Sequence, residues 1–207
     1  MALRHWMILG VTVVGLLLVG GSVAYHNALP PRLAIPNPIL PGSELSRLMH
    51  DAQAASRAGD HKRAAELYTQ ALAVEPGPNI ISRDLHAWRG SEYNYVDMSK
   101  EAAADYDTAL RVGYFGEMSE EAIRAHMGRG YALMGLDQYR RAKNDFDIVL
   151  KHVPNDGKRA SSTLAWRGGA WQGLGDRARA IADYQAALAL DPNNGYARDG
   201  LKDLQDP

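Results

Sequence analysis

The chain has 207 residues, of which 23 are basic and 24 acidic, so its formal net charge is −1 at pH 7. This balance argues against a nucleic-acid-binding surface, which needs a basic excess to displace counterions from phosphates. The sequence contains no cysteine, and this excludes disulfides, thiolate metal sites, lipid-modified cysteine and cysteine nucleophiles.

The first predicted element is an apolar segment at residues 6–25 that carries no formal charge. As a helix it would span about 30 Å, the thickness of one hydrocarbon core. Trp6 and Tyr25 bracket it, and Arg4 precedes it, so the positive-inside tendency places residues 1–5 in the cytoplasm. We therefore expect a single-pass inner-membrane protein whose remaining chain lies in the periplasm. The alternative is a signal peptide cleaved near Ala24, which would leave a secreted or periplasmic protein.

Residues 26–42 form a predicted proline-rich linker that holds five of the ten prolines. Proline restrains its own backbone and that of the preceding residue to extended geometry, so this segment is expected to be a stiff stalk. Near polyproline II geometry its fifteen residues 27–41 could reach about 45 Å. Its apolar residues either pack on the domain that follows or lie along a membrane partner; they are Leu33, Ile35, Ile39 and Leu40.

The remainder of the chain repeats one pattern of 34 residues, at 45–78, 83–116, 123–156 and 161–194. Each repeat has a small residue at position 8, alanine at position 20 and an aromatic at position 24. Three repeats have proline at position 32, where the second has Tyr114. In chain order, the residues at positions 8, 20 and 24 are Ala52, Ala64 and Tyr68; Gly90, Ala102 and Tyr106; Gly130, Ala142 and Phe146; and Gly168, Ala180 and Tyr184. A period of this size predicts a stack of helical units.

The last repeat predicts how each unit folds. A first helix ends at Leu174-Gly175-Asp176, where glycine serves as the C-cap and aspartate as the next N-cap. The following segment, Arg177–Leu190, has an apolar stripe at helical spacing and ends at Asp191-Pro192. A short helix over residues 195–205 is expected to cap the stack. One such hairpin cannot bury its apolar stripe alone, but stacked neighbours can.

Together these residues resemble the tetratricopeptide repeat (TPR) family, with residues 43–207 as the TPR domain. The resemblance implies an all-α fold: an α-solenoid of four TPR helical hairpins plus a C-terminal capping helix, preceded by one N-terminal transmembrane helix. The sequence departs from the family at position 4, usually tryptophan, where it has Leu48, His86, His126 and Leu164. Extra residues also separate the repeats, at 79–82, 117–122 and 157–160.

A second departure is at position 7, where the family has leucine and three repeats here have arginine. The same three repeats have aspartate at position 23. Position 7 normally faces the hairpin core, and the first repeat, which lacks the arginine, has Leu67 at position 23. From this co-occurrence we expect a half-buried ion pair in each of the three hairpins, with the arginine stem in the core. The alternative is that the two residues are separately solvated. The predicted pairs are Arg89 with Asp105, Arg129 with Asp145, and Arg167 with Asp183.

By the resemblance, the first helices of the repeats line a concave groove that binds a partner. The predicted groove residues are Met49, His50, Gln53, Trp88, Asn94, Tyr95, Arg124, Met127, Tyr131, Met134, Trp166 and Gln172. The lysines and asparagines of the family's carboxylate clamp are missing from this set. Aromatic and thioether side chains instead suit an apolar peptide or helix. The alternative for Trp88 and Trp166 is that they fill the space between repeats.

The sequence predicts no catalytic, cofactor-binding or metal-binding residues, and hence no enzyme. It has no GxSxG, HExxH or P-loop motif. His86 and His126 share position 4 of consecutive repeats and could begin a metal site, but no further ligands are evident.

The function expected from the sequence is a protein–protein interaction module of the bacterial envelope. It would serve as an adaptor, assembly factor or accessory subunit of a membrane or secretory complex, with a protein partner, a membrane contact through residues 6–25 and no nucleic acid. The first alternative is a structural scaffold that self-assembles into homo-oligomers. A more remote alternative is an enzyme or ligand carrier.

Overall fold

The computed structural model describes residues 42–113, 118–153 and 157–205, and their regular secondary structure is entirely helical. The all-α prediction is thereby confirmed for this part of the chain. None of the helices described in these ranges has the length and apolar character needed to cross a membrane. The predicted transmembrane segment, residues 6–25, and nearly all of the predicted linker lie outside the described residues.

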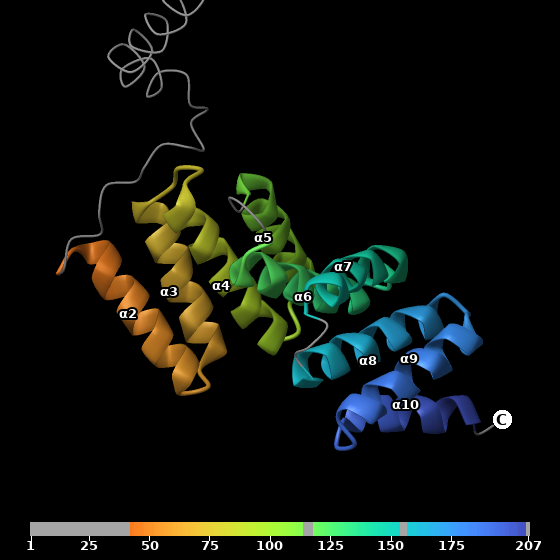
Figure 1. Ribbon diagram of the computed structural model, residues 1–207. Helices are drawn as coiled ribbons and strands as arrows, with labels where there is room; N and C mark the ends of the chain where they lie inside the picture. The colour runs from red at the N-terminus through yellow and green to blue at the C-terminus, as the bar shows by residue number, and fades with distance from the viewer. Residues whose placement is uncertain (1–41, 114–117, 154–156, 206–207) are drawn as a thin grey trace, which may run out of the picture.

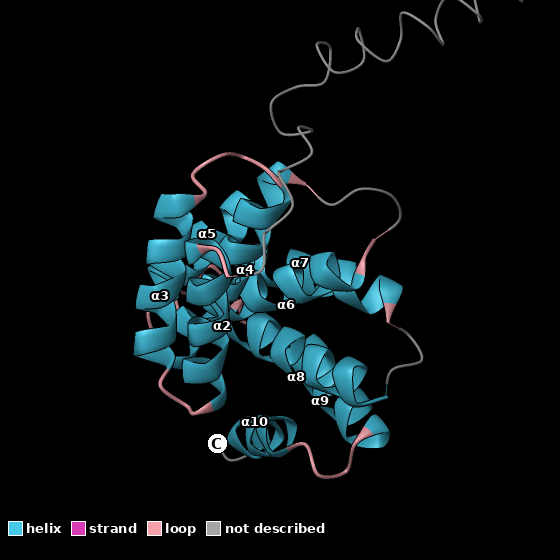
Figure 2. Ribbon diagram, turned by 90° about the vertical axis from the view of Figure 1, so that its left-hand side faces the viewer, coloured by secondary structure: helices cyan, strands magenta, loops and turns pink. Residues whose placement is uncertain are grey.

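The helices follow one another as antiparallel pairs stacked in chain order, from α2 at one end to α10 at the other (Figure 1). Each helix packs mainly against its neighbours in sequence. In addition, α4 contacts α6, and α6 contacts α8. Figure 2 shows the same succession from the side. The helices are α2 (Glu44–Arg57), α3 (His61–Val74), α4 (Ile80–Tyr95), α5 (Ser99–Val112), α6 (Glu120–Met134), α7 (Tyr139–His152), α8 (Gly157–Gly173), α9 (Arg177–Leu190) and α10 (Gly195–Gln205).

The residues that separate the repeats in sequence largely belong to the first helices. Residues 80–82, 120–122 and 157–160 extend α4, α6 and α8 at their N-termini. Local capping explains the first two starts. Asn79 and Ser82 form a reciprocal capping box at α4, and the Ser119 hydroxyl accepts a hydrogen bond from the Ala122 backbone N–H at α6.

The turn inside each hairpin contains one residue with left-handed backbone geometry, always at position 15 of the repeat. Gly59 and Gly175 both have φ +79°, while Asp97 has φ 58° and Asp137 has φ 56°. Glycine adopts this geometry without steric cost, and aspartate tolerates it better than most residues. The four hairpins therefore turn in the same way despite different sequences.

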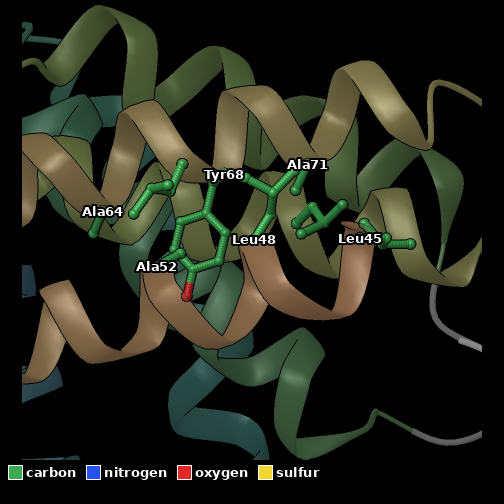
Figure 3. Close-up of a cluster of buried hydrophobic side chains, with 8 residues drawn as sticks. Leu45, Leu48, Ala52, Ala64, Tyr68 and Ala71 are labelled. Carbon is green, nitrogen blue, oxygen red and sulfur yellow. The ribbon is translucent and has the colours of Figure 1, made fainter. Parts of the chain in front are cut away.

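The core is built by packing the aromatic at position 24 onto the small residue at position 8. Figure 3 shows this in the first hairpin, where the Tyr68 ring lies beside Ala52. In the third hairpin the fit is tighter, because a Cβ atom on Gly130 would lie 2.5 Å from Cε1 of Phe146. Tyr106 serves two repeats, since its ring lies against Gly90 of its own hairpin and Gly128 of the next. The repeated small residues thus allow the aromatic rings to enter the helix interfaces.

Candidate functional site

Bidentate arginine–aspartate pairs join the two helices of the second, third and fourth hairpins. In the second, Nε of Arg89 donates to Oδ2 of Asp105 and Nη2 donates to Oδ1, both at 2.7 Å. Arg129 binds Asp145 in the same way at 2.8 and 2.7 Å, and Arg167 binds Asp183 at 2.7 Å for both bonds. Each carboxylate is buried, as an arginine with its stem in the core requires.

In two of these pairs a histidine also contacts the aspartate, and this third contact was not predicted from the sequence. Nδ1 of His86 lies 2.7 Å from Oδ1 of Asp105, and Nδ1 of His126 lies 2.8 Å from Oδ1 of Asp145. The signal was available, because histidine at position 4 and arginine at position 7 lie one turn apart on one helix face. The two imidazoles thus bind separate carboxylates, and the described residues contain no group of three side chains arranged for a metal.

The pKa of Asp145 shows which influence dominates in such a triad. Burial raises the pKa of this carboxyl, but hydrogen bonds from Arg129 and His126 outweigh burial and leave it below its usual value. Asp145 is therefore held as a carboxylate inside the hairpin, neutralised by its cationic partner.

The same arginines also connect consecutive repeats. Nη1 of Arg129 donates to Oδ1 of Asp107 at 2.8 Å, and Nη1 of Arg167 donates to Oδ1 of Asp147 at 2.8 Å. At the equivalent place Arg89 donates to Oγ1 of Thr69 at 3.0 Å. All three acceptors are at position 25 of the preceding repeat, so each arginine closes its own hairpin and binds the previous one.

The first junction adds a different buried carboxylate. Glu92 on α4 accepts a hydrogen bond from the Ser56 hydroxyl at 2.8 Å and lies 2.7 Å from Nδ1 of His61. The His61 ring stacks on Tyr95 with centroids 4.2 Å apart. Polar contacts therefore hold every junction between the four hairpins.

A groove of about 730 Å³ lies between the first helices α4, α6 and α8, and we call it the aromatic groove. Seven of the twelve predicted residues line it. They are Trp88, Asn94, Tyr95, Arg124, Met127, Tyr131 and Trp166. The other lining residues are Asp84, Ala87, Ser91, Tyr106, Glu121, Ala125 and Gly128.

The two tryptophans both pack between helices and line the aromatic groove. The Trp166 ring centroid lies 5.6 Å from that of Tyr131 and 6.0 Å from that of Phe146. The Trp88 centroid lies 5.9 Å from that of Tyr68. The lining of the groove therefore combines two tryptophans that contact buried aromatic rings with Tyr95 and Tyr131, which are exposed.

The structure does not bring the other five predicted residues into this groove. Met49 packs against the first core cluster, and His50 and Gln53 are exposed on α2. Met134 and Gln172 line a second hollow of about 510 Å³ farther along the stack. Tyr131 lines both hollows, so they adjoin.

A buried phenol in the first hairpin gives a pH prediction. Burial, with the nearby charge of Glu92, raises the pKa of Tyr68 to about 12. An unfolded tyrosine titrates near 10. The Tyr68 phenol therefore contributes in full to the free energy of unfolding below about pH 10, and this contribution is lost as the pH rises toward 12. Tyr68→Phe should flatten the fall in the free energy of unfolding between about pH 10 and 12, as measured by urea titration.

The matched control for this prediction is Tyr95→Phe, because Tyr95 is 68% exposed. This variant should keep the alkaline fall of the unchanged protein. Equal pH dependence in the Tyr68→Phe variant and the unchanged protein would contradict the role given to the buried phenol.

The fold and the groove define the class of the protein: an α-solenoid of stacked helical hairpins with a groove along its first helices. Residues 161–194 match the family profile described as tetratricopeptide repeat. Solved structures share the fold. A tetratricopeptide repeat protein from Parabacteroides merdae ATCC 43184 aligns with TM-score 0.60 and 22% identity, over 78% of this chain and 59% of that one. Residues 161–194 thus match a tetratricopeptide repeat profile, and the described helices share the fold of this solved tetratricopeptide repeat protein.

Further similarities agree with this fold. MamA, residues 41 to the end, from Desulfovibrio magneticus RS-1 aligns with TM-score 0.62 and 16% identity, over 80% of this chain and 95% of that one. In sequence, the chain is 27% identical to human DnaJ homolog subfamily C member 7 over 101 residues, 49% of this chain. It is 28% identical to the rice protein SGT1 homolog over 113 residues, 55% of this chain. The matches span only 19% and 28% of those two relatives.

Proposed function

We propose that the protein binds a peptide or helix of a protein partner in the aromatic groove. TPR proteins mediate protein–protein interactions, and their fold is typically non-catalytic. The observation that carries the proposal for this chain is the groove of about 730 Å³ with Trp88, Tyr131 and Trp166 in its walls. Buried or half-buried aromatics that are surrounded by packed residues are the usual anchors of protein interfaces.

The proposal includes a place in the bacterial envelope, where the protein would act as an adaptor, assembly factor or accessory subunit of a membrane or secretory complex. Its support is the uncharged segment at residues 6–25 and the single arginine before it. Protease protection in spheroplasts tests this part. Digestion of residues 43–207 from the outside supports the topology, and protection of those residues contradicts it.

The groove is tested by the double variant Trp88→Ala/Tyr131→Ala in the full chain. Tagged protein is extracted from its membrane in mild detergent, and the co-eluting proteins are quantified by mass spectrometry. We expect capture of the partner to fall at least about tenfold, because truncation of aromatic anchors commonly costs 2 kcal/mol or more of binding free energy (about 30-fold in affinity).

The matched control is Gln70→Ala/Gln185→Ala, which removes two exposed side chains from the second helices α3 and α9. Its capture should equal that of the unchanged protein. Circular dichroism and thermal unfolding establish that both double variants are folded. A folded Trp88→Ala/Tyr131→Ala variant that captures the partner normally would overturn the assignment of the groove.

A further inference from the structure

The second hollow combines aromatic with acidic side chains, and we call it the acidic pocket. Residues from helices α5 to α10, together with Asp97 in the turn before α5, form a space of about 510 Å³. Its aromatic residues are Tyr131, Tyr139, Tyr184 and Tyr196, and its charged residues are Asp97, Asp199 and Asp203. No lysine, arginine or histidine is among the residues that line it.

The three carboxylates of the acidic pocket have no partners within the described part of the chain. Neither an ion pair nor a side-chain hydrogen bond joins any of them to another described residue, whereas most other described carboxylates have one. Among the described residues, Glu44 and Glu101 are the only other carboxylates without an ion pair or a side-chain hydrogen bond. Three of the five unpaired described carboxylates thus converge on one pocket.

The walls of the pocket present aromatic surface beside this charge. Tyr131 is 43% exposed and Tyr196 is 48% exposed. The Tyr196 ring meets that of Tyr184 edge-on, with centroids 6.4 Å apart. Aromatic faces attract cations, and carboxylates add to the attraction. The protein uses this pairing elsewhere, since Lys143 and Arg179 lie 5.3 and 4.7 Å from the Trp171 ring centroid.

We propose that the acidic pocket binds a lysine or arginine side chain of the peptide that the aromatic groove holds. Tyr131 belongs to both hollows, so a single peptide can place apolar side chains between Trp88 and Trp166 and its cation in the acidic pocket. The partner is therefore a segment in which apolar residues are flanked by a basic one. This inference rests on the proposed function of the groove and adds the charge of the partner.

The test uses the full chain in detergent and two fluorescein-labelled peptides. The first has leucine, alanine and proline in the centre and lysine at both ends, so that either chain direction brings a cation to the pocket. The second has glutamine in place of lysine. Fluorescence anisotropy gives the Kd of each peptide. We expect the lysine peptide to bind the unchanged chain about tenfold more tightly than the glutamine peptide.

The decisive variant is Asp199→Asn/Asp203→Asn, which removes charge and keeps shape. It should weaken binding of the lysine peptide about tenfold and leave the Kd of the glutamine peptide unchanged. The matched control, Glu44→Gln/Glu101→Gln, removes two unpaired carboxylates elsewhere and should leave both Kd values unchanged. An equal loss in the control, or equal binding of the two peptides to the unchanged chain, would overturn the inference.

The remaining outcomes separate the inference from the proposed function. If both peptides bind equally and Trp88→Ala weakens both, the aromatic groove stands and the acidic pocket does not. If neither binds the unchanged chain, both proposals fail. The chain's own linker carries Arg32 among prolines and apolar residues. Tighter binding of the lysine peptide to an Arg32→Gln chain would make that linker the occupant and overturn the assignment to a separate partner.

Discussion

Replacement of Arg129 by methionine is expected to lower the free energy of unfolding by about 3–5 kcal/mol, because it leaves a buried carboxylate without its cation. The Asp145 side chain is only 3% exposed and receives two of its hydrogen bonds from Arg129. Methionine keeps much of the apolar stem, so the loss is chiefly that of charge pairing. Urea unfolding followed by circular dichroism measures the change.

Two further variants serve as controls for the effect of Arg129→Met. Arg47→Met removes an exposed arginine that lies 3.7 Å from Asp51, and it should cost less than about 1 kcal/mol. In the Arg129→Met/Asp145→Leu protein no uncompensated charge remains in the hairpin, so much of the stability should return. A loss for Arg129→Met no larger than that for Arg47→Met would show that the buried pair has no special weight.

The second large effect is expected at Phe146, whose side chain is fully buried. Phe146→Ala should cost about 3–5 kcal/mol of stability through the lost burial and the cavity that remains. The same ring supports Trp166, so the wall of the aromatic groove should loosen as well. Urea unfolding measures the first effect, and the lysine-peptide Kd measures the second.

Gly130→Ala provides a sharper check on the packing of Phe146. In the unchanged protein a Cβ atom at residue 130 would lie 2.5 Å from the Phe146 ring, so the substitution should cost about 1–3 kcal/mol. In the Phe146→Ala background that obstacle is gone, and the higher helix propensity of alanine should add up to about 1 kcal/mol. Additive effects in this double-mutant cycle would contradict the packing described for the third hairpin.

The features within one hairpin were the ones most open to prediction from sequence. The repeat period and the pairing of positions 7 and 23 both join residues at a fixed separation in the chain, whereas the packing of the position-24 aromatic on position 8 became evident only from the structure. The bonds from Arg129 to Asp107 and from Arg167 to Asp147 were not predicted, because they depend on how one hairpin is placed on the next. Stacking geometry is set by packing across repeats, which no single repeat encodes.

The same limit explains the groove residues. The groove residues were predicted by applying the same family positions to every first helix. In the structure, however, α4 contacts α6 and α6 contacts α8, while α2 packs chiefly against α3. Residues such as His50 therefore lie outside the aromatic groove although their position number suits it. The acidic pocket was harder still to foresee, because Asp97 and Asp199 come from segments about a hundred residues apart.

The bonds that arginines at position 7 make between repeats all run in one direction along the chain. Asp107 receives its arginine from the following repeat, and so does Asp147, while Arg129 and Arg167 reach back toward the N-terminus. The Asp107 carboxylate consequently gains its arginine partners only when the third hairpin is in place, whereas Asp147 also pairs with Lys143 of its own hairpin at 2.7 Å. Ribosomes make the chain from its N-terminus, so during synthesis the third and fourth hairpins each bring an arginine to an aspartate of the hairpin already made. The array thereby favours assembly in the order of translation.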